Sequence, residues 1–116
     1  MWSERDAGLV GEMIEAIALI EKIVDGEVRE AFLDDKAKPH ALAMCFVMMG
    51  EAANKVGAGV RMAHPEVPWQ RIAKLRHIIA HEYRRIDHGE LWEIAINDIP
   101  RLAIDLPAPP PPEDFD

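Results

Sequence analysis

Apolar residues recur along the chain at three- and four-residue spacing, which predicts amphipathic helices. The first helix is expected to begin at Ser3, with Asp6 three residues later as in a capping box, and to end at Asp25-Gly26. Its apolar stripe consists of Leu9, Met13, Ile17, Ile20 and Val24.

The following segments continue the helical pattern. A short helical piece over residues 27–33 precedes a second long helix, which should run from Pro39 to about Val56 and stop at Gly57 and Gly59. Proline suits the first turn of a helix because the donor it lacks would be unpaired there. Glycine ends a helix readily because it tolerates a left-handed backbone.

Prolines and a capping pattern delimit the last two helices. Pro68 opens a third helix, and Asp87 followed by Glu90 predicts the start of a fourth that continues to Leu106. Pro100 falls inside this fourth helix and should kink it, because the proline ring clashes with the preceding turn. No segment has the pattern of a β-strand, so we expect an all-α, up-and-down four-helix bundle.

Large side chains at helical spacing are assigned to the core. They are Trp69 and Trp92 and the methionines Met44, Met48 and Met49, for which a dimer seam is the alternative. Methionine is unbranched and flexible, so it suits either an irregular core gap or an adaptable interface.

Residues 107–116, PAPPPPEDFD, interrupt the helical pattern. This segment is too rich in proline for a helix and too poor in apolar side chains to fold alone. We therefore expect a helical domain over residues 1–106, followed by an extended, disordered tail over residues 107–116.

Composition narrows the class of protein. The 116 residues suffice for one domain, and no apolar run approaches the ~20 residues that span a bilayer. The start of the chain lacks the basic-then-apolar order of a secretory signal. Cys45 is the only cysteine, which excludes an internal disulfide and a cysteine-based zinc site. These features favour a cytoplasmic protein with no membrane partner.

The net charge of −8 argues against binding nucleic acid through general electrostatics. The charge is unevenly distributed, however. Residues 71–88 hold five Lys/Arg and two acids, a net +3, while the rest of the chain holds eight Lys/Arg and nineteen acids, a net −11. A basic segment on an acidic body indicates a local anion site, or an acidic surface for a basic partner.

The stretch LRHIIAHEY, residues 75–83, places ionisable side chains inside an apolar helix. Arg76 offers a planar cationic fork for a phosphate, and His81 can exchange a proton near neutral pH. Cleavage of RNA without a metal needs these two kinds of group, because the ribose 2′-hydroxyl is itself the nucleophile. On a regular helix the two residues are about 140° apart around the axis and about 7.5 Å apart along it.

Two other interpretations of this stretch stay open. His77 and His81, four residues apart, share a helix face and could be two metal ligands. No Glu follows the first His, and no obvious third ligand follows, although His88 or Glu82 could reach the site. The simplest interpretation is a solvated helix face that ends in the solvated pair Arg84 and Arg85.

Three stretches in order, MMGEAANKVG, HPEVPWQRIAKLRHIIAHEYRRID and ELWEIAINDIPRL, form a wider pattern. Its most specific part is an Arg, four residues, a His, one residue and a Tyr, here Arg76, His81 and Tyr83. Over roughly residues 7–106 the chain resembles the HepT-like branch of the HEPN superfamily. HEPN proteins are small helical bundles, and this branch comprises toxins paired with a minimal nucleotidyltransferase antitoxin.

The resemblance implies a metal-independent endoribonuclease that needs no cofactor and works as a homodimer. The motifs of two subunits would face each other and form one composite active site, in which Arg76 stabilises the scissile phosphate and His81 transfers the proton. It also implies that the antitoxin transfers AMP from ATP to Tyr83, where added bulk and negative charge block the substrate. The RNA substrate stays open, with transfer RNA as one option.

Four further residues receive auxiliary roles. His77, Arg84 and Arg85 could contact RNA phosphates, and Glu51 could orient Arg76 through an ion pair. His77 stands where this branch commonly has Asn, a departure that puts activity in question. The alternative function is a non-catalytic module that binds a nucleotide or a partner protein.

Overall fold

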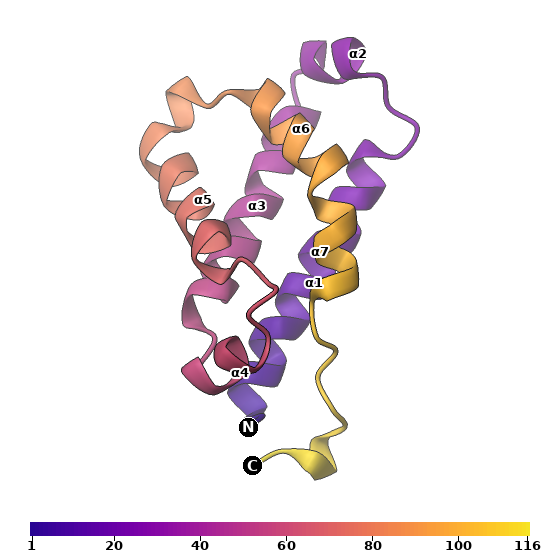
Figure 1. The fold of residues 1–116 in the computed structure, drawn as a ribbon. Coiled ribbons are helices and arrows are strands. Elements are labelled where there is room, and N and C mark those ends of the chain that lie inside the picture. Colours follow the sequence, from indigo (N-terminus) through magenta and orange to yellow (C-terminus); the bar gives the residue numbers. More distant parts are fainter.

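The computed structural model describes all residues, 1–116, as helices and connecting segments without a strand. The long elements are α1 (Glu4–Val24), α3 (Lys38–Lys55), α5 (Trp69–Glu82) and the consecutive pair α6 (His88–Asn97) and α7 (Ile99–Asp105) (Figure 1). The short elements are α2 (Arg29–Asp34), α4 (Ala58–Ala63) and two 3₁₀ turns, η1 (Tyr83–Arg85) and η2 (Pro112–Asp114). The predicted all-α bundle is confirmed. None of its helices is both long and apolar enough to cross a bilayer.

Helix boundaries follow the predicted caps. The side chains of Ser3 and Asp87 each accept, at 3.0 Å, the backbone N–H three residues later, so α1 and α6 begin where expected. The predicted fourth helix is divided at Asp98 into α6 and α7, with Pro100 in the first turn of α7. The proline therefore breaks this helix rather than only bending it.

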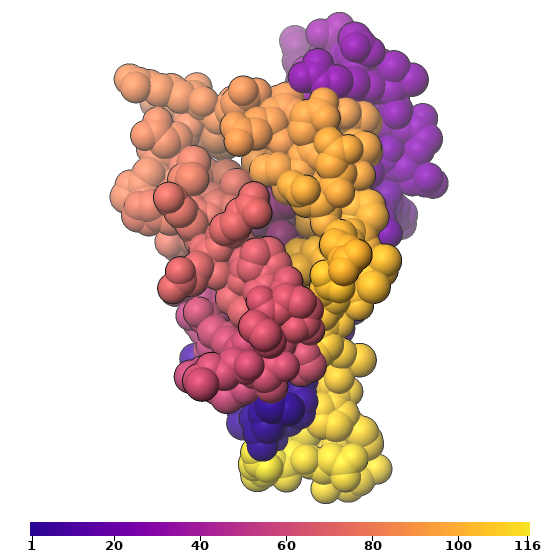
Figure 2. Space-filling view, viewed as in Figure 1, coloured from indigo at the N-terminus to yellow at the C-terminus, as the bar shows by residue number.

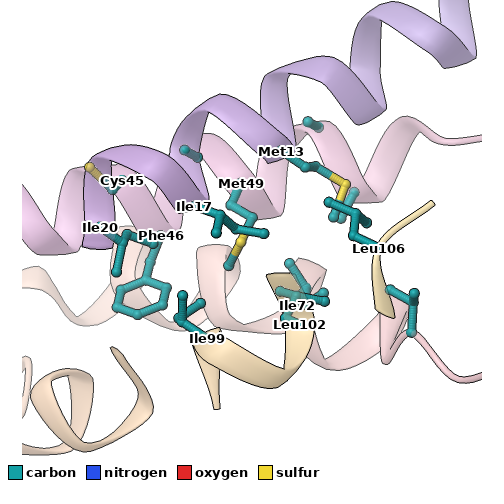
Figure 3. Packing of buried hydrophobic residues seen from close by; sticks show 14 of the residues in the cluster. Met13, Ile17, Ile20, Cys45, Phe46, Met49, Ile72, Ile99, Leu102 and Leu106 are labelled. Carbon is teal, nitrogen blue, oxygen red and sulfur yellow. The ribbon is translucent and has the colours of Figure 1, made fainter. Parts of the chain in front are cut away.

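The central helix of the bundle is α3, which packs against both α1 and α5 (Figure 1). Phe46 and Met49 of α3 are buried among Ile17 and Ile20 of α1 and Ile99 of α7 (Figure 3). Complete burial of a side chain of this size stabilises the fold by about 1.5–3 kcal/mol. The core therefore fixes α3 firmly, and α5 takes its position from α3.

Three of the five large side chains predicted to lie in the core are buried, and two are exposed. Trp69 and Trp92 are buried, and Met49 is only 2% exposed, as expected. Met44 and Met48, in contrast, are 58% and 45% exposed, so their assignment to the core is wrong. The methionine stripe is wider than the part of the α3 surface that the neighbouring helices cover, and these two side chains lie outside it.

The helix α4 occupies a segment in which no helix is predicted. The buried carboxylate of Asp6 accepts the N–H of Gly57 at 3.0 Å, just before α4. Arg61 of α4 donates to the carbonyl oxygens of Ala53 and Val56, at 2.6 and 2.9 Å. These carbonyls lie at the end of α3, where the helix itself supplies few donors, so α4 helps to cap α3.

The C-terminal tail is extended but does not show the predicted disorder. The Asp116 N–H donates to the Trp2 carbonyl at 2.7 Å, and the Asp116 carboxylate pairs with the amino group of Met1. Phe115 packs against the hydrophobic core. The tail therefore returns to the N-terminus (Figure 1), because one aromatic side chain and the chain ends supply contacts that its proline-rich composition does not reveal.

A groove separates α5 from α6 and α7 (Figure 2). The helix α5 packs on α3 and makes few contacts with α6 or α7, so a cavity of about 570 Å³ opens between them. Phe46 and Met49 of α3 form its base. The apolar side chains of its two walls are Ile72, Leu75, Ile78, Ile94, Ile99 and Leu102.

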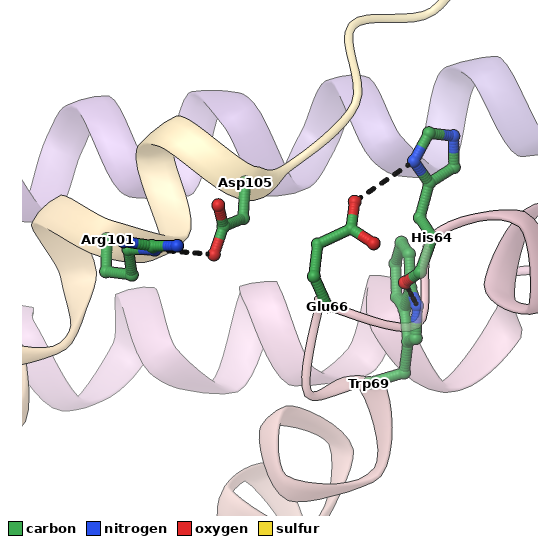
Figure 4. A network of polar contacts seen from close by, with 5 residues as sticks. All are labelled: His64, Glu66, Trp69, Arg101 and Asp105. Atoms are coloured by element: carbon green, nitrogen blue, oxygen red, sulfur yellow. Dashed lines mark hydrogen bonds and ion pairs between the residues drawn. The ribbon is translucent and has the colours of Figure 1, made fainter.

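Polar contacts border one end of this groove (Figure 4). In the loop before α5, the His64 ring lies 3.3 Å from a carboxylate oxygen of Glu66, and the indole N–H of Trp69 donates to the His64 carbonyl at 3.0 Å. Across the groove, Arg101 donates to Asp105 at 2.9 Å within α7. The Trp69 hydrogen bond therefore fixes the loop at the N-terminal end of α5, whereas the LRHIIAHEY stretch extends to the C-terminal end of this helix.

Candidate active site

Gly50 determines how closely α3 and α5 approach. A Cβ atom built on Gly50 would lie 2.4 Å from the Cβ of Arg76 and 2.7 Å from the carbonyl oxygen of Ile72. Real side chains do not tolerate such distances, so only glycine allows α5 to pack this closely at Arg76. The base of the Arg76 side chain is thereby placed directly against the backbone of α3.

The side chain of Arg76 forms the expected ion pair with Glu51. Its Nε lies 2.8 Å from Oε2 of Glu51, whose other oxygen lies 3.4 Å from Nζ of Lys55. The Nε atom is buried and its N–H does not point at the carboxylate, so the contact is electrostatic rather than a hydrogen bond. Both side chains are more than 40% exposed, so the pair stabilises the fold by at most about 1 kcal/mol and leaves the guanidinium accessible.

His77 and His81 lie side by side on the exposed surface of α5. Their ring centroids are 4.2 Å apart and their planes are inclined at 46°. Neither ring makes a hydrogen bond within the chain, and both residues are exposed. The structure therefore brings together the two histidines that share a helix face, and their ring nitrogens remain free.

Arg76 and His81 do not meet within one chain. The helix α5 is continuous from Trp69 to Glu82, so the two side chains leave it about 140° apart. Arg76 is directed towards Glu51 on α3, while His81 lies beside His77 on the exposed side of α5. A phosphate bound to Arg76 of one chain would therefore need a histidine from elsewhere.

Tyr83 lies just beyond α5, in the 3₁₀ turn η1. Its side chain is 62% exposed. The Arg84 Nε donates to its hydroxyl oxygen at 3.4 Å, and the Arg84 guanidinium carbon lies 6.0 Å from the ring centre. Arg85 is also exposed. The phenol is therefore accessible to a macromolecular partner and lies among positive charges.

A second histidine pair joins the N-terminal ends of α3 and α6. The rings of His40 and His88 are 5.1 Å apart at 77°, and the Nδ1 of His88 is buried without a hydrogen-bond partner. Burial, together with the charge of nearby His40, lowers the pKa of His88 below its ordinary value, although Asp87 opposes the change. Sequence patterns give no signal for this pair, because its members are far apart in the chain.

Known proteins are similar to this chain over much of its length. A family model described as "Ribonuclease HepT-like" matches residues 13–107. "Probable ribonuclease HepT" of Thermococcus cleftensis is 34% identical over 91 residues, which cover 78% of this chain and 83% of that protein. "Putative RNase MJ1380" of Methanocaldococcus jannaschii is 32% identical over 102 residues, 86% of this chain and 93% of that protein.

A third relative matches over a shorter length. "Putative RNase MJ1216" of Methanocaldococcus jannaschii is 32% identical over 73 residues, 63% of this chain and 60% of that protein. No solved structure matches the chain. The match of the family model begins within α1 and continues past the end of α7, so it includes the second half of α1 and all of the other main helices.

Proposed function

Because the chain belongs to the ribonuclease HepT-like family, we propose that it is a toxin-type endoribonuclease that cleaves RNA without a metal ion. The observation that carries this proposal is the motif of Arg76 and His81 on α5 and Tyr83 on η1, with all three side chains accessible and Arg76 held by Glu51. The test is cleavage of RNA in EDTA by the purified protein, which His81→Ala should abolish.

The proposed reaction is an internal transfer at one phosphodiester. The ribose 2′-oxygen forms a bond to phosphorus as its proton leaves, and the bond to the 5′-oxygen breaks as that oxygen gains a proton. The products are a 2′,3′-cyclic phosphate and a free 5′-hydroxyl. His81 is the group that exchanges protons, and the Arg76 guanidinium neutralises the charge that grows on the phosphate oxygens.

His77, Arg84 and Arg85 are proposed to hold the RNA backbone near this site. All three are exposed, and they follow or flank the catalytic residues along α5 and η1. Glu51 is a positioning residue in this proposal, because its charge restrains Arg76 although the contact forms no hydrogen bond. Five N–H groups on a guanidinium leave several for a phosphate.

A second copy of the chain completes the proposed site. Arg76 and His81 of one chain point to different sides, so two copies must face each other to gather both groups around one phosphate. Met44 and Met48 are exposed on the same face of α3 as Glu51, at four- and three-residue spacing. These apolar side chains next to the ion pair favour a homodimer seam along α3.

The double variant Met44→Glu with Met48→Glu should be monomeric and lose RNA cleavage, because four carboxylates would meet at the seam. Both side chains are exposed in the monomer, so its helical content should not change. Size-exclusion chromatography with light scattering measures the mass. Met62→Glu is the control, since Met62 is 79% exposed on α4 and should leave the dimer intact. A double variant that stays dimeric would contradict this seam.

The proposed antitoxin is a minimal nucleotidyltransferase that inactivates the toxin at Tyr83. The phenol oxygen forms a bond to the α-phosphorus of ATP, its proton is released, and pyrophosphate leaves. The attached AMP adds bulk and negative charge close to the RNA-binding side chains of α5 and η1, where it would exclude a phosphate. The exposure of Tyr83 supports this role, because a second enzyme must reach its hydroxyl.

Incubation of the toxin with the antitoxin and ATP should increase its mass by one or more AMP groups, and Tyr83→Phe should abolish the increase. Phenylalanine lacks only the hydroxyl, so folding should be unaffected at this exposed position. Intact-protein mass spectrometry measures the modification. Tyr83 is the only tyrosine of the chain, so AMP that persists on the variant would place the modification on another residue type.

A further inference from the structure

The two exposed histidines of α5 have the arrangement of a chelating pair. His77 and His81 are four residues apart on a continuous helix, with ring centroids 4.2 Å apart. Two imidazoles bound to one ion at about 2.0–2.1 Å have ring centres about 4.5–5 Å apart. Small side-chain rotations would therefore suffice, and no backbone movement is needed.

We infer that His77 and His81 form a two-ligand site for a divalent transition-metal ion of the kind that prefers imidazole, such as Zn²⁺ or Cu²⁺. Their ring nitrogens have no competing hydrogen bonds, and both rings are open to solvent. Water completes the coordination, since no group of three or more His, Cys, Asp or Glu side chains is placed to hold an ion. The site is therefore exchangeable and regulatory, not structural.

Metal binding at this site blocks catalysis, a consequence that rests on the proposed function. A ring nitrogen of His81 that binds an ion cannot exchange a proton with the RNA. The positive charges of Lys74 and Arg84, near the two ends of the pair, weaken the binding of a cation. The metal ion therefore occupies His81, and prevents its proton transfer, only when the concentration of the metal is raised.

The other histidine pair is a weaker candidate. His40 and His88 belong to different helices, and both lie in first turns, where the positive end of the helix dipole repels a cation. The Nδ1 of His88 is also closed off from solvent. These properties make His40→Asn the matched control for His77→Asn.

The test is a Cu²⁺ titration of full-length protein without a histidine tag, followed by electron paramagnetic resonance. Wild-type protein should bind one ion per chain with nitrogen ligands. His77→Asn and, separately, His81→Asn should remove this signal, while His40→Asn and the loop variant His64→Asn should retain it. Circular dichroism verifies that each variant is folded. A signal that persists in both α5 variants, or that disappears in His40→Asn, overturns the inference.

A second measurement connects the site to activity. Zn²⁺ should inhibit RNA cleavage reversibly, with recovery in EDTA. Each variant is compared with its own metal-free rate, and His77→Asn should raise the half-inhibitory Zn²⁺ concentration at least about tenfold, since even an outer partner of a ligand contributes about 10–100-fold to affinity. If the half-inhibitory Zn²⁺ concentration is the same for wild-type protein and His77→Asn, the regulatory role is overturned. Absence of any cleavage would refute the proposed function, whereas the Cu²⁺ spectra would still decide the site.

Discussion

RNA cleavage should fall at least about 100-fold when His81 is replaced by alanine, because a positioned acid–base group contributes about 10²–10⁴ to the rate. Arg76→Ala should lower the rate by about 10²–10³, the contribution of one donor that stabilises transition-state charge. Single-turnover rates on a labelled RNA, measured with excess EDTA, report the chemical step. Circular dichroism should be unchanged for His81→Ala, because this side chain is exposed and makes no hydrogen bond.

His64→Ala is the matched control for this experiment. His64 is also partly exposed, at 26%, but it lies in the loop before α5, at the opposite end of that helix from His81. Its variant should cleave at the wild-type rate. Undiminished cleavage by His81→Ala would refute the proposed mechanism. Wild-type protein that binds RNA but never cleaves it would instead favour the non-catalytic binding module.

Mixing the two inactive variants tests whether one site draws on two chains. In a dimer of Arg76→Ala with His81→Ala, one of the two cross-chain combinations has both groups intact. Partial activity should therefore return after the variants are mixed and allowed to exchange subunits. Mass spectrometry should demonstrate that mixed dimers form. If they form without recovery of activity, either Arg76 and His81 of the same chain act together, or the site needs both Arg76 and both His81 side chains of the dimer.

The variant Gly50→Ala should destabilise the protein by about 1–3 kcal/mol, the usual cost of inserting a methyl group into a closely packed interface. The new methyl group would collide with the Cβ of Arg76 and the carbonyl of Ile72, so α5 must move away from α3. Movement of α5 displaces Arg76 from Glu51, and cleavage should fall as well. Urea denaturation measures the free energy of unfolding, and cleavage rates measure the displacement.

Gly8→Ala supplies the control for Gly50→Ala. Both glycines lie inside helices, but a Cβ on Gly8 of α1 would meet nothing within 4 Å. Alanine is a better helix former than glycine by about 1 kcal/mol, so this variant should be more stable than wild type. If Gly50→Ala were stabilised to the same degree, the close approach of α3 and α5 would not exist in solution.

Local signals in the sequence were sufficient to predict most of the fold. Ser3 and Asp87 begin helices because their side chains satisfy backbone donors three residues on, and Pro100 interrupts a helix through its own ring. These effects act within one turn. The positions of Met44 and Met48 depend instead on how much of α3 its neighbours cover, which periodicity does not specify.

Contacts between distant residues explain the remaining differences. The tail is ordered because Asp116 binds Trp2 and Phe115 reaches the core, and no local pattern reveals such a pairing. The Asp6 carboxylate likewise supports Gly57 across half the chain. A helix of six residues such as α4 is too short to be recognised by periodicity, and its stability comes from these tertiary hydrogen bonds.

The candidate site was only partly predictable. The spacing of His77 and His81 predicts adjacent rings, and the ion pair of Glu51 with Arg76 is present as expected. The catalytic roles of Arg76 and His81 come from the resemblance and stay predictions. The backbone contact at Gly50 has no sequence signal of its own, because it depends on where α5 crosses α3.

The attachment of α5 chiefly to α3 has a mechanical consequence. A helix enclosed on several sides, such as α3, can shift only if the whole core rearranges, whereas α5 borders an open groove and can tilt at a smaller free-energy cost. The fold thus combines a rigid support, α3, with a helix, α5, whose angle can adjust.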